Sequence, residues 1–332
     1  MANVPNTKLR LLHVLDILNK KTDEGNILTS NDIVRELEDR GLTGERRSVI
    51  RDINTLIEYG YDICPFEENN IGYYMRSRLF EEEEIKILID SVIAFKALSP
   101  RKTRQLIKKL LSLSSNRFAK KTMGNLYIDS KGKSENECVY YNINMIEEAT
   151  SKDKKISFKY LTYDINKEQK FRKEGEDYIV SPYALVWRDD NYYLIGVHDK
   201  YSNISHYRVD RINQVKILDE NRKLAQHMES IEDFNVTKYM DSTFNVFTGE
   251  EERVMIRFTN DLLNAIIDKF GVDVTMFPKD DGHSIIIADV LVSEGFISWI
   301  LQFGGKVQLL EPAELRDEVK ERILELNKAY GM

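Results

Sequence analysis

The sequence has 332 residues, of which 42% are hydrophobic and 31% charged, and its formal net charge is -7. This length predicts two or three domains, and the composition is that of an ordinary globular protein with enough apolar residues for several cores. No apolar run approaches the roughly 18 residues that span a bilayer, so we expect no membrane partner. The net acidity argues against a generic nucleic-acid coat protein, but a net charge does not describe local patches.

The N-terminus and the cysteines indicate a reducing compartment. The first residues lead directly into a helical pattern and lack the cleavage signature of a secreted protein. Cys64 and Cys138 are far apart and have no metal-ligand spacing around them. We therefore expect a cytoplasmic protein without a structural metal.

Residues 1–78 predict a small helical domain that ends in a hairpin. Apolar residues recur at helical spacing in three segments, 6–21, 29–41 and 45–60. Thr29 with Asp32 predicts a cap for the second helix, and glycines follow the second and third helices. Residues 61–75 indicate two short strands around the polar turn EENN. Helix, helix, turn, helix and hairpin is the order of a winged helix-turn-helix domain.

The third predicted helix has an exposed face that suits DNA. The polar residues of this face are Arg46, Arg47, Ser48, Arg51 and Asn54. Guanidinium groups bind phosphates and guanine edges, and hydroxyl and amide groups bind other bases. The alternative is an ordinary solvated helix face, since residues 1–78 contain 11 Lys and Arg against 13 Asp and Glu. The order of the elements favours DNA, because helix-turn-helix proteins present the first half of this helix to the groove.

The segment SNDIVRELEDRGLTGERRSVIRDINTLIEYGYDI resembles the N-terminal domain of bacterial regulators. Their third helix carries the run R-x-v-x-R-D-i-x-x-L, which Arg47, Arg51, Asp52 and Leu56 match. The resemblance implies that Arg46, Arg47 and Arg51 read DNA, whereas Asp52 orients a neighbouring arginine.

Residues 79–140 predict a helical linker. An acidic helix begins near residue 80 and is expected to end at Pro100. Residues 101–121 then contain eight Lys and Arg and no Asp or Glu. This run is either a second phosphate-contacting surface or, as we favour, a basic helix that lies across the acidic one or faces water.

Residues 141–220 predict a helix followed by at least four short strands, a pattern typical of a small barrel. Aromatic and basic residues concentrate on these strands: Lys159, Tyr160, Tyr183, Tyr192, Tyr193, His206, Tyr207, Arg208 and Arg211. Aromatic rings stack on bases and cations pair with phosphates, so the set favours ligand binding. The alternative is a barrel core with tyrosines at its rim and arginines paired to Asp189, Asp190 or Asp210.

The run SHYRVDRI, residues 205–212, is predicted to be one strand with His206 and Arg208 on one face. These two side chains would form one wall of an anion-binding pocket. Arg211 breaks the alternation, so it joins them only through a bulge or twist, or otherwise has a structural role.

Catalysis is poorly supported. The sequence contains no nucleophile elbow, glycine-rich phosphate loop or metal-spaced His and Cys residues. His198 and His206 are candidates for proton transfer, but no partner acid or nucleophile can be assigned to them. We expect a protein that is not an enzyme and has no catalytic residues, no cofactor and no metal.

The central segment resembles the WYL domain, a Sm-like barrel. The matching runs are SPYAL, NYYLIGV and HYRVDRI, and Tyr192 stands where the family usually has Trp. The resemblance implies a sensor for a nucleotide or a short single-stranded nucleic acid. It places Tyr193, His206, Arg208 and Arg211 in the pocket.

Residues 221–332 predict strand, helix, strand, helix and strand, followed by a closing helix. This order suggests a ferredoxin-like α+β domain. The run WILQFGGKVQLLEPAELRDEV resembles the extension that follows WYL domains, which implies a role in dimer packing and in covering the ligand site.

The sequence therefore predicts a multidomain α+β protein. Its expected parts are a winged helix-turn-helix domain (1–78), a helical linker (79–140), a WYL Sm/SH3-like barrel (141–220) and a ferredoxin-like extension (221–332). The expected function is a ligand-responsive transcriptional regulator that binds double-stranded DNA as a homodimer. The alternative is an RNA- or nucleotide-binding accessory factor that does not control transcription at an operator.

Overall fold

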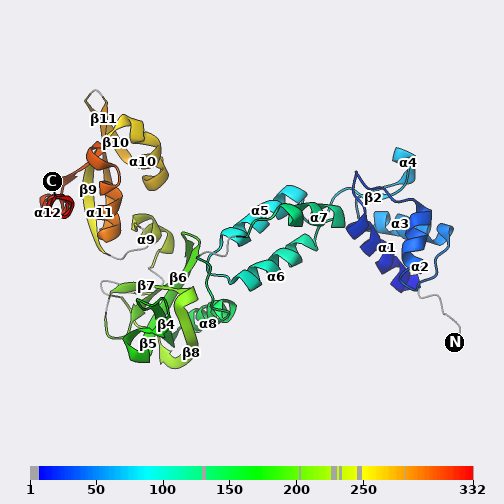
Figure 1. Ribbon diagram of the computed structural model, residues 1–332, viewed down its shortest axis with the longest axis horizontal. Helices are drawn as coiled ribbons and strands as arrows, with labels where there is room; N and C mark the ends of the chain where they lie inside the picture. Colours follow the sequence, from blue (N-terminus) through cyan, green and yellow to red (C-terminus); the bar gives the residue numbers. More distant parts are fainter. Residues whose placement is uncertain are drawn as a thin grey trace. The chain divides into compact units, whose positions relative to one another are not determined.

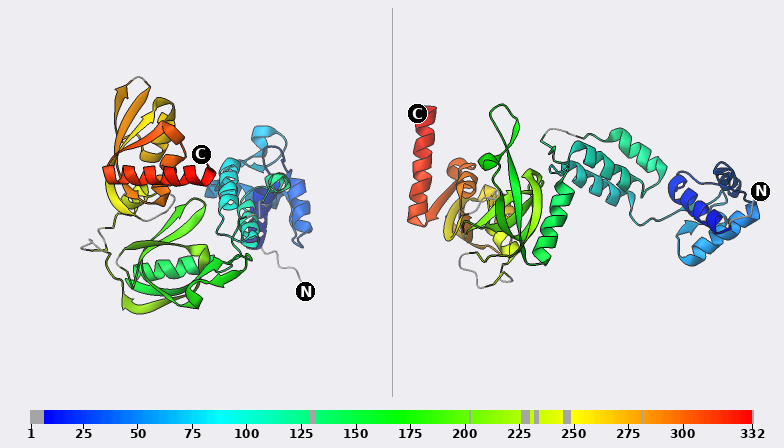
Figure 2. Two further views of the ribbon diagram at one scale, coloured as in Figure 1. Left: turned by 60° about the vertical axis from the view of Figure 1, so that its left-hand side comes forward. Right: turned by 90° about the horizontal axis from the view of Figure 1, so that it is seen from below.

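The computed structural model describes residues 7–128, 132–201, 203–225, 230–231, 234–244, 249–280 and 282–331 (Figures 1 and 2). The chain divides into two compact units, Met1–Glu137 and Cys138–Met332. The polar composition of residues 129–137 predicts a linker. Residues 129–131 of this segment lie outside the described residues. The two units are taken in turn.

Three helices open the first unit: α1 (Thr7–Lys21), α2 (Ser30–Glu38) and α3 (Arg46–Tyr59). The hydroxyl of Thr29 accepts a hydrogen bond from the Asp32 amide, and the Asp32 carboxylate accepts one from Thr29, as the predicted capping box requires. Gly60 ends α3 in the left-handed conformation, which a residue without Cβ adopts without strain. The three helices share an apolar core that includes Val14, Ile17, Ile33 and Ile53, all fully buried.

A short antiparallel hairpin follows α3. Strand β1 (Ile63–Cys64) pairs with β2 (Tyr74–Met75). The predicted simple turn between them is wrong, because a short helix, α4 (Phe66–Asn69), takes its place. Asn69 stabilises this connection, since its side chain accepts hydrogen bonds from the amides of Ile71 and Gly72.

Three further helices complete the first unit: α5 (Glu82–Ala94), α6 (Pro100–Leu111) and α7 (Asn116–Asn125). Pro100 does not end the acidic helix as predicted. It is the first residue of α6, where the missing amide hydrogen costs nothing, and Ser99 caps this helix. The basic run 101–121 was predicted as one helix but forms two, because Ser115 caps the second helix, α7. Ile85 and Ile89 of α5 pack on Ile107 and Leu111 of α6 in a small core.

The second unit begins with α8 (Val139–Ser151) and a curled sheet that forms a half-barrel (Figure 2). Its strands are β3 (Lys154–Tyr163), β4 (Gln169–Phe171), β5 (Tyr178–Arg188), β6 (Asn191–His198), β7 (Ile204–Arg208) and β8 (Ile212–Asn221). The strand order is β4-β3-β5-β6-β7, and β8 pairs with β3. Helix α8 packs against β3, β5 and β8.

The inside of the curled sheet is aromatic. Phe158 is fully buried, and its ring centroid lies 5.6 Å from that of Tyr178 and 5.3 Å from that of Tyr207. Tyr160 completes the group, with its centroid 5.8 Å from both tyrosines. Offset and edge-on ring pairs of this kind stabilise a core beyond their buried area.

The predicted single strand 205–212 is wrong. Strand β7 ends at Arg208, a 3-10 turn η2 (Val209–Arg211) follows, and Ile212 begins β8. The fully buried Asn142 of α8 fixes this turn, because its amide donates hydrogen bonds to the carbonyls of Val209 (3.4 Å) and Ile212 (2.7 Å).

The C-terminal part of the second unit has four antiparallel strands: β9 (Glu250–Thr259), β10 (Thr275–Asp280), β11 (His283–Val292) and β12 (Val307–Glu311). Their order in the sheet is β10-β11-β9-β12. Three helices join this sheet: α10 (Leu263–Phe270), α11 (Glu294–Leu301) and α12 (Ala313–Tyr330). The core gathers Val254, Ile256 and Phe258 of β9 against Phe296 of α11.

Strand β10 was not predicted from the sequence. This strand contains Pro278, which lacks an amide hydrogen, and it lies at the edge of the sheet, where a proline is tolerated. The observed order is therefore strand, helix, strand, strand, helix, strand, with α12 after it.

Candidate functional site

Helix α3 presents three of the predicted DNA-binding residues on one exposed face. Arg47, Arg51 and Asn54 are four and three residues apart and are exposed. Residues at this spacing share a helix face. The other face carries the buried Val49, Ile53 and Leu56, so the helix cannot rotate without losing its core contacts.

The polar contacts around α3 are local. Arg46 Nε donates to the hydroxyl of Ser30 (3.1 Å), and Arg51 Nη2 donates to the hydroxyl of Ser48 (3.2 Å). Arg47 and Asn54 form no side-chain hydrogen bond with any residue of the described ranges. Their polar groups are therefore available to a ligand.

Asp52 pairs with an arginine, but with one from α1. Arg10 Nε and Nη2 donate to its two carboxylate oxygens at 2.7 and 3.2 Å. These hydrogen bonds raise the pKa of Arg10. The pair forms part of the wall of a surface depression of about 630 Å³ that Ser48 and Arg51 also line.

In the half-barrel, four predicted ligand-binding residues come together at the end of β7. The register of β6 and β7 places Tyr193 directly opposite Arg208, and His206 shares the same face by alternation. The turn η2 places Arg211 beside them, close enough for its charge and that of Arg208 to lower the pKa of Tyr193. Burial of the Tyr193 ring outweighs both and raises this pKa. We call Tyr193, Arg208, Asp210 and Arg211 the Arg208 cluster.

Arg208 is the best-anchored member of this cluster. Its Nε and Nη2 donate to the two carboxylate oxygens of the buried Asp210, and Nη2 also donates to Asn191 Oδ1 (2.9 Å). Burial acts to lower the pKa of Arg208, but the pair with Asp210 outweighs this effect and raises it. The Arg208 amide donates to the hydroxyl of Tyr160 (3.1 Å), which holds the backbone. The arginine is therefore oriented, while Nη1 forms no hydrogen bond within the described ranges.

Arg211 differs from Arg208 in its contacts. It is partly exposed and forms no hydrogen bond or ion pair with another described residue. The unexpected turn η2, rather than a bulge in a strand, brings its charge to Tyr160 and Tyr193.

His206 contacts a residue that was not predicted to belong to the site. Its Nε2 lies 3.0 Å from the hydroxyl of Tyr239, which belongs to α9 (Val236–Ser242). Burial raises the pKa of Tyr239. The segment around Tyr239 has no strand pattern or charge signal, so only the fold reveals this contact.

Helix α9 is bound at its C-terminal end by a cation from each neighbouring sheet region. Arg188 of β5 donates to the carbonyl of Met240 (2.9 Å), and Lys269 of α10 donates to the carbonyl of Thr243 (2.7 Å). Cations at this end of a helix are favoured by its dipole. Burial, together with the charge of Arg188, lowers the pKa of Lys269 to about 8.

Lys159 and Tyr192 contact residues outside the Arg208 cluster. Lys159 Nζ is 5.6 Å from the ring of Phe171, and Tyr192 packs edge-on against Trp187. Tyr160 contributes its hydroxyl to the cluster, but its ring belongs to the aromatic core.

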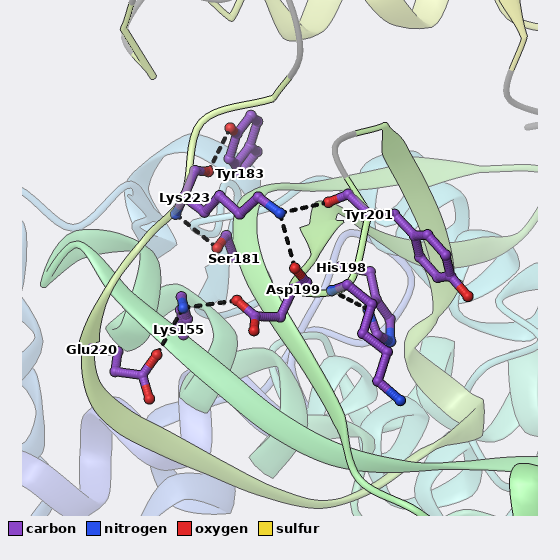
Figure 3. Close-up of polar contacts among 9 residues, drawn as sticks. Lys155, Ser181, Tyr183, His198, Asp199, Tyr201, Glu220 and Lys223 are labelled. Carbon is purple, nitrogen blue, oxygen red and sulfur yellow. Dashed lines mark hydrogen bonds and ion pairs between the residues drawn. The ribbon is translucent and has the colours of Figure 1, made fainter.

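Tyr183 lies in a polar network at another part of the half-barrel (Figure 3). Its hydroxyl donates to the carbonyl of Lys223 and accepts from the amide of Ala225. Lys223 Nζ in turn donates to the carbonyls of Asp199 and Tyr201, both at 2.9 Å. These contacts are those of a core tyrosine.

His198 belongs to the same region. Its Nδ1 accepts a hydrogen bond from the amide of Lys200 (3.1 Å), and its ring packs against Tyr178 and Tyr201. Burial is the main cause that lowers the pKa of His198, and the charges of nearby lysines add to it. This environment favours the neutral ring.

The described residues contain no group of three or more His, Cys, Asp and Glu residues that could hold a metal ion. None of the described helices is long and apolar enough to cross a membrane.

Comparisons with known proteins agree with the two-sheet organisation of the second unit. Residues 141–217 match the WYL domain, and residues 250–326 match the WCX domain. The chain is 22% identical over 296 residues to the "Uncharacterized HTH-type transcriptional regulator YobV" of Bacillus subtilis (strain 168). That alignment covers 86% of this chain and 89% of YobV.

Two solved structures show remote similarity. The proteasome accessory factor B/C (PafBC) of Arthrobacter aurescens is 17% identical, with a TM-score of 0.29. The match covers 96% of this chain but only 48% of PafBC, so the chain spans about half of that protein. A CRISPR Cas-related protein is 16% identical, with a TM-score of 0.38 and coverage of 76% and 74%.

Proposed function

The chain belongs to the WYL-domain transcriptional regulators, and we propose that it is a cytoplasmic, ligand-responsive regulator that binds double-stranded DNA as a homodimer. In this proposal residues 7–78 act as a winged helix-turn-helix domain, with α3 as the recognition helix. The β9–α12 segment acts as a ferredoxin-like domain that holds two copies together. Two copies are needed because paired recognition helices meet paired half-sites.

The observation that carries DNA binding is the alignment of Arg47, Arg51 and Asn54 along α3, opposite its buried face. A helix anchored in this way presents guanidinium and amide groups in a fixed row. Such groups bind phosphate oxygens and base edges. The acidic residues nearby limit non-specific attraction, so binding would depend on these particular side chains.

Fluorescence anisotropy with a genomic library of duplex fragments tests this role. We expect Arg47→Ala with Arg51→Ala to weaken duplex binding and to reduce the slope of log K against log salt by about 1–2. Arg35→Ala is the matched control, because it removes an exposed arginine of α2. Equal binding by the double variant and the wild type would exclude α3 as the reader. If the wild type binds single strands but no duplex, the accessory-factor alternative is favoured.

The second part of the proposal is that the Arg208 cluster binds a nucleotide or a short single-stranded nucleic acid. Support comes from an oriented guanidinium with free Nη1 donors, a second cation in Arg211 and the aromatic ring of Tyr193. Cations with an interleaved ring suit phosphate and base together. Because no acid and nucleophile pair accompanies them, we propose binding without turnover.

Effector binding would act on the DNA-binding domains by changing the balance between two arrangements of the dimer. Links of this kind are typically worth about 1–3 kcal/mol. The measurement is DNA affinity with and without the effector, in the wild type and in Arg211→Ala. Unchanged effector response in the variant would exclude Arg211 from the sensor.

A further inference from the structure

A second group of cations surrounds Tyr178, at the start of β5. Tyr178 is 5% exposed, and its hydroxyl has no hydrogen-bond partner within the described ranges. By contrast, the hydroxyls of Tyr160 and Tyr183 are both hydrogen-bonded. A buried hydroxyl without a partner is unusual, because its lost hydration is not compensated. A ligand that accepts a hydrogen bond from this hydroxyl would supply the missing partner.

Two cations of the turn η1 (Arg172–Gly175), before β5, lie near the Tyr178 ring. Lys173 Nζ lies 4.7 Å from the centroid of the Tyr178 ring. Arg172 is close enough for its charge to lower the pKa of both Tyr178 and Tyr207, although burial raises both values overall. Glu176 is the acid that acts on Tyr178 in the opposite sense.

A histidine also packs against Tyr178. The ring of His198 packs edge-on against it, with centroids 5.7 Å apart, and Lys200 is close enough to lower the pKa of His198. Asp199 is the acid nearest this histidine, and its carboxylate is bound by Lys155 (Figure 3). Arg172, Lys173 and Lys200 form no ion pair with another described residue. We call Arg172, Lys173, Tyr178, His198 and Lys200 the Tyr178 cluster.

The backbone that presents these cations is strained. Lys173 (φ 51°) and Glu174 (φ 54°) both adopt the left-handed conformation within the turn η1 (Arg172–Gly175). Residues with a Cβ rarely do so, and such conformations concentrate at binding sites that a surrounding structure enforces. Here the strained residue Lys173 is the one that reaches the Tyr178 ring.

An exposed ring lies next to the cluster. Tyr201 is 57% exposed, and its centroid is 5.2 Å from that of His198. A solvent-facing ring beside a group of cations offers a surface on which a nucleobase can stack while its phosphate meets the positive charge.

We propose that the Tyr178 cluster is a second phosphate-binding site, separate from the Arg208 cluster, for a nucleotide or a single-stranded oligonucleotide. Arg172 and Lys173 hold the phosphate, the Tyr178 hydroxyl donates a hydrogen bond to it, and Tyr201 stacks on the base. The two clusters lie on different elements: Arg172 and Lys173 belong to η1, before β5, whereas Arg208 ends β7 and Arg211 lies in η2. The second site does not depend on the first being a sensor.

The test uses the full chain and a fluorescein-labelled tetrathymidylate with a 5′-phosphate. We expect Arg172→Ala with Lys173→Ala to weaken binding about tenfold or more, as the loss of charge-assisted hydrogen bonds predicts. Tyr178→Phe should weaken it several-fold. The control Lys170→Ala, which removes an exposed cation of β4, should bind as the wild type does. Wild-type affinity in the double variant would overturn the proposal.

Competition and a cross-comparison complete the experiment. Displacement of the probe by inorganic phosphate and by AMP to a similar extent would indicate recognition of phosphate alone. A clear preference for AMP, lost in Tyr201→Ala, would indicate stacking as well. If Arg211→Ala loses all binding and the Arg172/Lys173 variant loses none, the second site is excluded while the Arg208 sensor stands. The reverse result supports the second site and excludes the sensor, and a wild type that binds no probe excludes both.

Discussion

Arg208 is bound by Asp210, two residues further along the chain, through hydrogen bonds of 3.0 and 2.8 Å. The carboxylate is buried, whereas about a quarter of the arginine side chain is exposed. Asp210 therefore fixes the direction of the guanidinium and leaves part of it accessible. Arg208 ends β7 and Asp210 lies in η2, so the pair joins the strand to the turn that follows it.

Asp210→Asn tests how much this pair stabilises the fold. The substitution removes the charge and one of the two acceptors, and it leaves a partly buried cation uncompensated. We expect the free energy of unfolding to fall by about 1–3 kcal/mol, less than for a fully buried pair because solvent screens Arg208. Urea denaturation gives the value. A double-mutant cycle with Arg208→Gln should show that most of this loss in unfolding free energy is coupling energy between the two residues.

Arg211→Ala separates binding from stability. Arg211 forms no hydrogen bond or ion pair within the described ranges, so we expect a change in unfolding free energy of no more than about 0.5 kcal/mol. The Arg208 cluster should bind a short phosphorylated oligonucleotide about tenfold more weakly, since it loses a cation. The matched control is Lys216→Ala, an exposed lysine of β8. A variant that unfolds more easily yet binds normally would assign Arg211 a structural role.

Tyr178→Phe and Tyr183→Phe form a matched pair for stability. Tyr183 loses two hydrogen bonds, to the carbonyl of Lys223 and from the amide of Ala225, so we expect a cost of about 1–3 kcal/mol. Tyr178 loses a hydroxyl that has no partner among the described residues, so the change should be close to zero or slightly stabilising. Thermal unfolding of both variants measures the difference. Equal losses would show that the Tyr178 hydroxyl is satisfied in solution.

The pKa of His198 predicts a loss of stability in acid. Burial lowers this pKa in the folded protein, so the unfolded chain binds a proton more readily. The neutral ring contributes its full stability above the pKa of the unfolded chain, about 6.5. This stability is lost as the pH falls from there through the pKa of the folded protein. His198→Asn keeps an acceptor for the Lys200 amide but does not titrate. The difference between the two unfolding curves, measured from pH 8 to 5, should shrink as pH falls.

Local features of this fold are readable from the sequence. Thr29 and Asp32 are three residues apart, and the capping box that they form depends on no distant group. Gly60 likewise ends α3 through its own backbone freedom. The strand pattern of NYYLIGV is likewise local, and β6 (Asn191–His198) covers these residues.

Distant contacts account for what the sequence did not reveal. The break after Arg208 depends on Asn142, whose side chain binds carbonyls 67 and 70 residues away. Residues 205–212 contain no signal for this contact, because Asn142 lies in the distant helix α8. Strand β10 was hidden by Pro278, whose cost disappears at a sheet edge. The contact between His206 and Tyr239 joins segments 33 residues apart and follows no sequence pattern.

Helix α9 belongs to neither sheet, yet Tyr239 contacts His206 of β7, and the carbonyls of Met240 and Thr243 are bound by Arg188 of β5 and Lys269 of α10. The seven residues of α9 therefore have contacts to both the WYL and the WCX domain. Under mechanical or chemical stress, α9 cannot leave one domain without breaking a contact to the other, so the second unit should respond as a single cooperative element. Limited proteolysis would then cut within α9 (Val236–Ser242) only when both domains open together.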